Sequence, residues 1–143
     1  MLLLLGDGAL MEQMKSLVRQ MGLEHSVRFM GMVRDCSPYY QAMDAFVMPS
    51  IYEALPLTGI EAQCAGLPCL FSETVSAETG LSKRAEFLPI GSGNEHLWVE
   101  KLMEIQRQNF ERHDLPESAK RFDAGINAKK MAARYEALWG QSV

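Results

Sequence analysis

The stretch Ala45–Ser72, AFVMPSIYEALPLTGIEAQCAGLPCLFS, decides the fold. The apolar run Ala45–Met48 is typical of a buried strand, and a second such run follows at Cys69–Ser72. Between these runs the spacing predicts a helix over Leu57–Ala65, which ends at Gly66. A strand, a helix and a second strand in this order form the unit of a parallel sheet with crossover helices. The stretch therefore predicts an α/β fold.

The rest of the chain alternates in the same way between apolar runs and segments with helical spacing. Further strands are predicted at Leu2–Leu5, Val27–Met30 and Glu86–Leu88, and further helices over Leu10–Met21 and after the capping residues Ser37, Asn94 and Asp123. We therefore expect a parallel sheet with flanking helices, in a single domain over residues 1–143.

Charge and cysteine usage exclude some classes of protein. The chain has 14 Lys and Arg against 18 Asp and Glu, a net charge of -4, and its basic residues are not clustered as nucleic-acid binding requires. The three cysteines form no CxxC pair, which indicates a reducing compartment. The run Leu2–Leu5 is far shorter than the ~7–15 residues of a signal-peptide core. The expected location is the cytosol.

Two carboxylates mark the candidate site. Glu53 and Glu61 stand eight positions apart, on either side of the predicted helix start at Leu57 and Thr58. In open α/β sheets, ligands bind beyond the carboxyl ends of the strands, where this loop lies. A diphosphate could dock on the first N–H groups of the helix, while the carboxylates accept hydrogen bonds from hydroxyls. This arrangement suits a sugar nucleotide.

Each of these residues also has a purely structural interpretation. Thr58–Glu61 matches a capping box, in which Glu61 would bond back to the backbone of Thr58. Glu53 could be an ordinary solvated loop carboxylate. The turn Gly6–Gly8 could hold an anion on its N–H groups, or could simply connect a strand to a helix. Spacing does not decide between these alternatives.

The segment that carries the two carboxylates resembles a known signature. Pro49–Glu53, followed by Glu61–Ala62 and Ala65–Pro68, resembles the motif of the retaining family 4 glycosyltransferases, two-domain Rossmann-like enzymes of the GT-B type. The resemblance covers about residues 1–90 and implies the C-terminal, donor-binding domain. The segment Glu61–Leu70 is also similar to bacterial enzymes that build capsular polysaccharides and exopolysaccharides.

The resemblance implies a role for each matching position. Glu53 would be the catalytic-site carboxylate that contacts donor-sugar hydroxyls, and Glu61 would bind the ribose. The remaining donor-binding positions would be Ala54, Leu55, Pro56, Leu57, Thr58, Gly6, Gly8 and Val33, with the diphosphate on the N–H groups of Leu57 and Thr58 and the base against the backbone of Val33. Ala54 stands where the family usually has glycine, which would restrict the loop beside Glu53.

The resemblance also implies parts that lie outside this sequence. These are an acceptor-binding N-terminal domain, and a strand and helix whose Arg and Lys hold the diphosphate. Near the donor motif the basic residues are only Arg34, Lys83 and Arg84, so we do not expect catalysis by this chain alone. The absent strand would lie in the middle of the sheet. We therefore expect unpaired edges, with an altered sheet or self-association.

The implied activity is the transfer of a hexose from a UDP or GDP sugar to a glycan or lipid-linked acceptor, in polysaccharide synthesis. No metal and no other cofactor is implied. The whole enzyme would associate peripherally with the inner face of the membrane. Two alternatives remain open, a non-catalytic nucleotide-binding or assembly module and a sugar-nucleotide epimerase domain.

Overall fold

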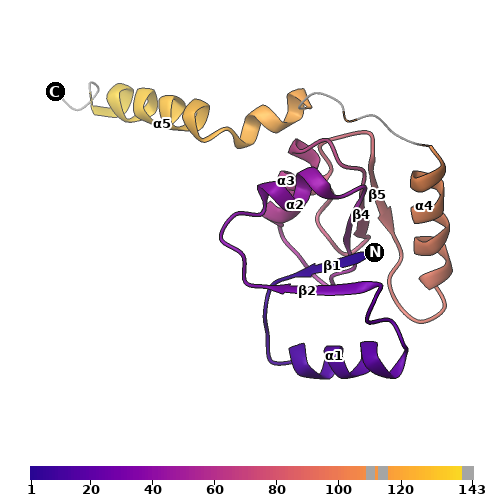
Figure 1. Cartoon of the computed structure of the whole chain (residues 1–143). Coiled ribbons are helices and arrows are strands. Elements are labelled where there is room, and N and C mark those ends of the chain that lie inside the picture. Colours follow the sequence, from indigo (N-terminus) through magenta and orange to yellow (C-terminus); the bar gives the residue numbers. More distant parts are fainter. Residues whose placement is uncertain (109–111, 113–115, 140–143) are drawn as a thin grey trace. The chain divides into compact units, whose positions relative to one another are not determined.

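The computed structural model describes residues 1–108, 112 and 116–139. The chain forms two compact units, Met1–Pro38 and Tyr39–Val143. Each unit contains a parallel sheet, with the order β1-β2 in the first and β3-β4-β5 in the second. The chain is therefore an α/β protein, as predicted (Figure 1).

The first unit is a strand, a helix and a parallel strand. These are β1 (Leu2–Leu5), α1 (Met11–Gln20) and β2 (Val27–Gly31). The strands pair in parallel from Leu2 opposite Val27, and the register shifts so that Leu5 lies opposite Gly31. Gly31 adopts a φ of 67°, a left-handed conformation that glycine reaches without steric cost. The three predicted elements are confirmed.

The second unit is built around its central strand. β4 (Cys69–Ser72) is fully buried and lies between β3 (Phe46–Met48) and β5 (Ala85–Leu88), both parallel to it. The Phe71 ring of β4 lies 5.4 Å from the Phe87 ring, measured between centroids. Strands buried on both faces read as continuous apolar runs, which is why the sequence marked β4 so clearly.

The division into two sheets leaves strand edges open. Within the described residues, β1 pairs only with β2, and β3 pairs only with β4. Leu2 and Leu4 of β1 remain 49% and 39% exposed. The predictions of an altered sheet and of self-association stay predictions.

The crossover helix α3 (Leu57–Cys64) lies unusually close to β4. A Cβ atom at Gly59 would stand 2.7 Å from Cε1 of Phe71 and 3.2 Å from Cγ2 of Thr79. Both neighbours are fully buried, with an exposed fraction of 0%, and cannot move aside easily. Glycine at this position therefore permits the helix to approach the sheet.

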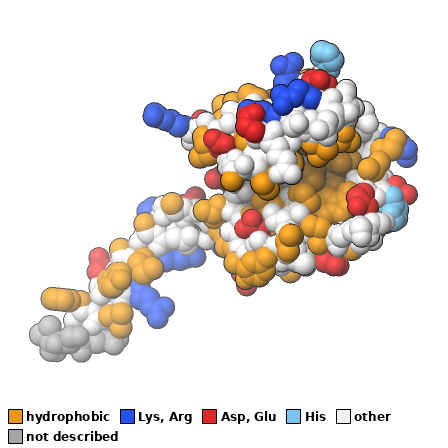
Figure 2. Space-filling view, turned by 90° about the horizontal axis from the view of Figure 1, so that it is seen from below, with side chains coloured by type: hydrophobic (Ala, Val, Ile, Leu, Met, Phe, Trp, Pro, Cys, Tyr) orange, Lys and Arg blue, Asp and Glu red, His pale blue; other side chains and the backbone are white. Residues whose placement is uncertain are grey.

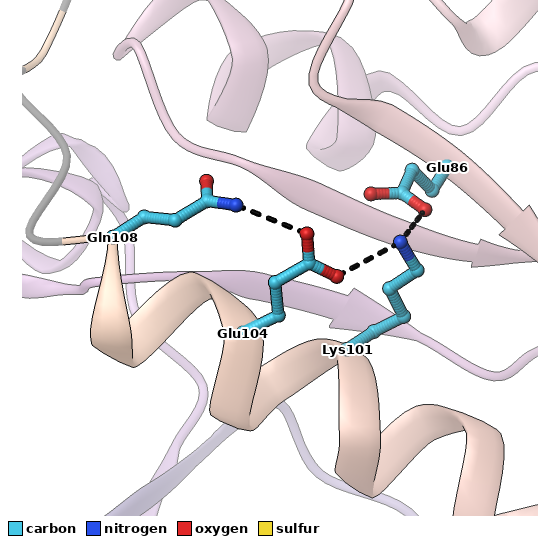
Figure 3. A network of polar contacts seen from close by, with 4 residues as sticks. All are labelled: Glu86, Lys101, Glu104 and Gln108. Atoms are coloured by element: carbon cyan, nitrogen blue, oxygen red, sulfur yellow. Dashed lines mark hydrogen bonds and ion pairs between the residues drawn. The ribbon is translucent and has the colours of Figure 1, made fainter.

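The remaining elements lie on either side of β5 in the sequence. They are η1 (Ala77–Thr79) before it, and α4 (Glu95–Arg107), η2 (Glu117–Phe122) and α5 (Ala124–Trp139) after it. Lys101 of α4 bonds Glu86 of β5 at 2.9 Å and Glu104 at 3.0 Å (Figure 3). The hydrogen bond to Glu86, followed by that to Glu104, raises the pKa of Lys101. This contact joins α4 to the edge of the sheet.

Two of the three predicted helix caps are wrong. Asn94 has φ -99° and ψ -2° and makes no capping bond, because a cap requires the extended backbone. Ser37 is instead the first residue of α2 (Ser37–Ala42), and the Asp35 carboxylate accepts its N–H at 2.9 Å. Asp123 is confirmed, since its Oδ1 accepts the N–H of Ile126 at 2.8 Å.

Helix α5 presents hydrophobic and basic side chains to solvent together (Figure 2). Met131 and Trp139 are 56% and 81% exposed, and no residue of α5 is buried. Apolar side chains at helical spacing are usually packed in a core, but those of α5 are not buried in the described structure. Within the same described residues, no helix has both the length and the apolarity needed to cross a membrane.

We expect Gly59→Ala to destabilise the second unit. The substitution favours the helix by about 1 kcal/mol, but the new methyl group overpacks the core against Phe71, which typically costs about 1–3 kcal/mol. Urea denaturation should therefore show a lower free energy of unfolding. Gly8→Ala is the control, because its Cβ would meet no atom within 4 Å. A free energy of unfolding about 1 kcal/mol above that of the wild type, which is the gain expected from helix propensity alone, would contradict the close approach.

Candidate functional site

The helix α3 separates its residues into a packed face and an open face. Those buried against the sheet are Gly59, Ile60, Ala62 and Gln63. Those exposed are Leu57, Thr58, Glu61 and Cys64. Helical spacing places residues three and four apart on one stripe, so Glu61 and the helix start face solvent together. This is the arrangement that the predicted donor site requires.

The first turn of α3 offers free N–H donors. The N–H groups of Gly59 and Ile60 donate to the Pro56 carbonyl at 3.1 and 3.3 Å. In the part of the chain that the structure describes, the N–H groups of Leu57 and Thr58 have no acceptor, and no side chain caps the helix. Unpaired N–H groups and the positive end of the helix dipole together attract an anion.

The capping-box interpretation of Glu61 is wrong. The helix begins at Leu57 after Pro56, so Thr58 lies inside the first turn and cannot act as the cap. The Glu61 carboxylate instead accepts a hydrogen bond from the Tyr40 hydroxyl, at 3.1 Å from Oε2. Glu61 is therefore oriented by a tertiary contact, with its other carboxylate oxygen left for a ligand.

Tyr40 is a site residue that the sequence did not reveal. Its side chain is 6% exposed, and its ring packs edge-on against Phe46 with centroids 6.2 Å apart. The hydroxyl reaches Glu61 from 21 positions away in the sequence. No local spacing connects these two residues, so only the fold could bring them together.

The Glu53 loop is fixed by its backbone. Val75 forms an isolated parallel bridge with Glu53, and the Ser76 N–H donates to the Glu53 carbonyl at 3.1 Å. The hydroxyls of Ser72 and Thr74 both donate to the Ser50 carbonyl. The loop is thus held at two points by the segment that follows β4.

These backbone contacts leave the Glu53 side chain available. It is half-buried, and its carboxylate has no hydrogen bond or ion pair among the described residues. Of the other predicted donor residues in this loop, Ala54 and Leu55 are exposed and Pro56 is buried. A carboxylate that is anchored through its backbone but unpaired can accept hydrogen bonds from hydroxyls.

Cys64 lies on the same open face as Glu61. Desolvation, followed by the charge of Glu61, raises the pKa of its thiol. Burial also raises the pKa of the Cys69 thiol in β4. Because a thiolate is the nucleophilic form, neither cysteine is set up for nucleophilic chemistry at neutral pH.

The predicted glycines lie in the first unit and engage their N–H groups there. Gly6 has φ 128° and donates to the Gly31 carbonyl at 2.8 Å. The Gly8 N–H donates to the Asp7 carboxylate at 2.7 Å. These bonds fit the strand-to-helix turn interpretation, and an anion-binding role for the two glycines stays a prediction.

A hollow of about 470 Å³ adjoins this turn, lined in part by Gly8, Glu12 and Lys15. Lys15 and Glu12 form an ion pair at 2.8 Å.

Val33 lies after β2, half-buried, and its predicted contact with the base is untested. Over the described ranges, no group of three His, Cys, Asp or Glu side chains is placed to hold a metal ion.

The α/β fold, with its parallel sheets and flanking helices, is that of the C-terminal half of GT-B glycosyltransferases. The family model described as Glycosyl transferases group 1 matches residues 1–108. The chain belongs to this family.

Relatives with named activities support the family. The Escherichia coli UDP-Gal:alpha-D-GlcNAc-diphosphoundecaprenol alpha-1,3-galactosyltransferase is 39% identical over 70 residues, which cover 48% of this chain and 18% of that protein. The lipopolysaccharide core biosynthesis mannosyltransferase LpsB of Rhizobium meliloti is 29% identical over 135 residues, which cover 88% of this chain and 38% of that protein. The chain spans about a fifth of the length of the curated relatives at the head of the comparison.

Solved structures match the fold. Sucrose-phosphate synthase from Thermosynechococcus elongatus superposes with a TM-score of 0.75 at 22% identity, covering 97% of this chain and 38% of that one. Anabaena HepE, solved in complex with UDP, gives a TM-score of 0.69 at 21% identity, covering 94% and 40%. The predicted identity as the C-terminal half of a GT-B enzyme is confirmed.

We expect Tyr40→Phe to lower the free energy of unfolding by about 0.5–1.5 kcal/mol, the usual net contribution of one hydrogen bond. The phenyl ring retains the contact with Phe46, so the change isolates the hydroxyl. Urea denaturation measures the effect. Tyr39→Phe is the matched control on the same helix, and its hydroxyl has no hydrogen bond in the described structure. If both variants lose the same stability, Tyr40 does not orient Glu61.

Proposed function

We propose that this domain binds the nucleoside-diphosphate portion of a sugar nucleotide, within an enzyme that transfers a hexose to a glycan or lipid-linked acceptor. The observation that carries the proposal is the open start of α3, where unpaired N–H groups lie on the same face as Glu61. Three kinds of ligand group correspond to three features of the site: the diphosphate, the ribose and the sugar.

The diphosphate binds at the N–H groups of Leu57 and Thr58. A diphosphate carries several acceptor oxygens and negative charge, so it satisfies both donors and interacts favourably with the helix dipole. Pro56 precedes these donors and has no N–H of its own. Its carbonyl accepts the N–H groups of the third and fourth helical residues, and the first two N–H groups of the helix stay open.

The two carboxylates bind hydroxyl groups on either side of the diphosphate. Glu61 accepts hydrogen bonds from the ribose, because a carboxylate oxygen is left over after the Tyr40 contact. Glu53 accepts hydrogen bonds from the hexose, at a loop held by Val75 and Ser76. Charge-assisted hydrogen bonds of this kind are short and strong, so they also orient the sugar.

The reaction we propose retains the anomeric configuration. The leaving diphosphate deprotonates the acceptor hydroxyl on the face from which it departs, and no metal ion takes part. HepE, solved with UDP, and the galactosyltransferase named for UDP-Gal support a uridine nucleotide as donor. A relative named Vi polysaccharide biosynthesis protein, from Salmonella typhi, supports a role in polysaccharide synthesis.

The acceptor and the cations that neutralise the departing diphosphate are proposed to come from beyond Met1–Val143. On the open face of α3, as far as the structure describes it, no Lys or Arg is bonded to Glu53 or Glu61. Electrostatic stabilisation of developing charge is usually a large contribution to catalysis, so a second set of groups is required. The cytosol, at the inner face of the membrane, is the proposed location.

We expect Glu61→Ala to weaken UDP binding at least about tenfold, or ~1.4 kcal/mol, because the ribose loses its acceptor. The fold should be retained, since Glu61 is not a helix cap. Isothermal titration calorimetry with UDP and GDP measures the affinity. Glu78→Ala is the control, because it removes an equal charge from an exposed position in the same unit.

A second ligand sharpens this test. The wild type should bind UDP more tightly than its 2′-deoxy form, because Glu61 accepts a hydrogen bond from the 2′-hydroxyl. Glu61→Ala should lose that preference, since the variant cannot interact with the hydroxyl in either case. Failure of the folded chain to bind either nucleotide would refute the proposed function. Persistence of the preference in Glu61→Ala would remove Glu61 from the ribose site.

A further inference from the structure

Gln63 is a polar side chain in the apolar core of the second unit. It lies on α3 two positions after Glu61, on the packed face of the helix, and is 1% exposed. Its amide makes four hydrogen bonds. The amide nitrogen Nε2 donates to the carbonyls of Gly59 at 2.9 Å and Thr79 at 2.7 Å. The amide oxygen Oε1 accepts the N–H groups of Leu81 at 2.7 Å and Ser82 at 3.1 Å.

These bonds use the full capacity of the side chain. A glutamine amide has two N–H donors and an oxygen with two lone pairs, and all four sites are occupied. A shorter or apolar side chain would leave backbone groups of Thr79, Leu81 and Ser82 without these hydrogen bonds, and an unpaired polar group in a core is destabilising. Gln63 therefore fixes the segment Thr79–Ser82 on the helix with defined geometry.

The same segment leads back to the Glu53 loop. The Thr79 N–H donates to the Ser76 carbonyl at 2.9 Å, and the Ser76 N–H donates to the Glu53 carbonyl at 3.1 Å. Thr79 is fully buried, and Leu81, 8% exposed, packs in the core with Ile60. The stretch from Val75 to Ser82 is thus fixed to Gln63 at one end and to Glu53 at the other.

We propose that Gln63 is a positioning residue that acts on Glu53 through the segment Val75–Ser82. It holds this segment on α3, and the segment holds the Glu53 loop. Because Glu61 lies on α3 with Gln63, the Glu53 carboxylate keeps a fixed position relative to Glu61. The proposal rests on the proposed function only where it assigns the sugar to Glu53. Loss of this link should weaken the contact between Glu53 and the hexose more than the contact between Glu61 and the ribose.

Gln63→Met tests the link from the helix end. Methionine has a similar length and packs in a core but cannot form the four bonds. We expect hydrogen exchange at the amides of Leu81 and Ser82 to accelerate, and exchange at the Ser76 amide to accelerate about tenfold as well. The amides of β4 should keep their protection. Nuclear magnetic resonance resolves each of these amides.

Ser76→Pro tests the link from the loop end. Ser76 has φ -53°, which proline accepts, and the substitution removes the N–H bonded to Glu53 without touching Gln63. It also removes the hydroxyl that accepts the Glu78 N–H, so Ser76→Ala, which loses only that hydroxyl, is the matched control. Because coupling is reciprocal, exchange at Leu81 and Ser82 should accelerate in this variant too. This second variant answers the question even if Gln63→Met does not fold.

Ligand binding supplies the functional measurement. In both variants the affinity for a UDP-hexose should fall relative to that for UDP alone, which a general loss of stability would not produce. Unchanged Ser76 exchange in Gln63→Met, or unchanged Leu81 and Ser82 exchange in Ser76→Pro, would overturn the proposal. Uniform acceleration that includes β4 would also overturn it. Absence of nucleotide binding by the wild type would instead refute the proposed function and leave the exchange results valid.

Discussion

The second unit depends on the close contact between α3 and β4. Gly59 lets the helix backbone approach the Phe71 ring to a distance that any Cβ atom would prevent. This contact decides which face of α3 is buried, because Gly59 and Gln63 lie one turn apart on the same side. Once that face is against the sheet, Leu57, Thr58 and Glu61 must face outward. The packing of the core therefore places the candidate site.

The site combines groups that are fixed with groups that are free. The Glu53 backbone, the Ser50 carbonyl and one oxygen of Glu61 are all held by hydrogen bonds within the unit. The first N–H groups of α3 and the Glu53 carboxylate are left without partners among the described residues. Groups that are oriented in advance lose little entropy on binding, so such a division favours tight and specific recognition.

Much of the fold followed from residue pattern. The strand at Cys69–Ser72 and the helix from Leu57 were predictable because a continuous apolar run and helical spacing each reflect local geometry. Caps were less predictable: Asn94 has the right chemistry but the wrong backbone conformation, and Asp35 performs the role expected of Ser37. Element ends depend on backbone angles that composition does not fix.

The sequence by itself determined the family and the positions of the two carboxylates, since the motif from Pro49 to Pro68 lies within one continuous segment. Only the tertiary structure decided that Glu61 is held by Tyr40 and that Gln63 joins α3 to the segment leading to Glu53. The physical reason is distance along the chain. These contacts join residues 16 to 21 positions apart, and only the packing of helix on sheet brings such residues within hydrogen-bonding distance.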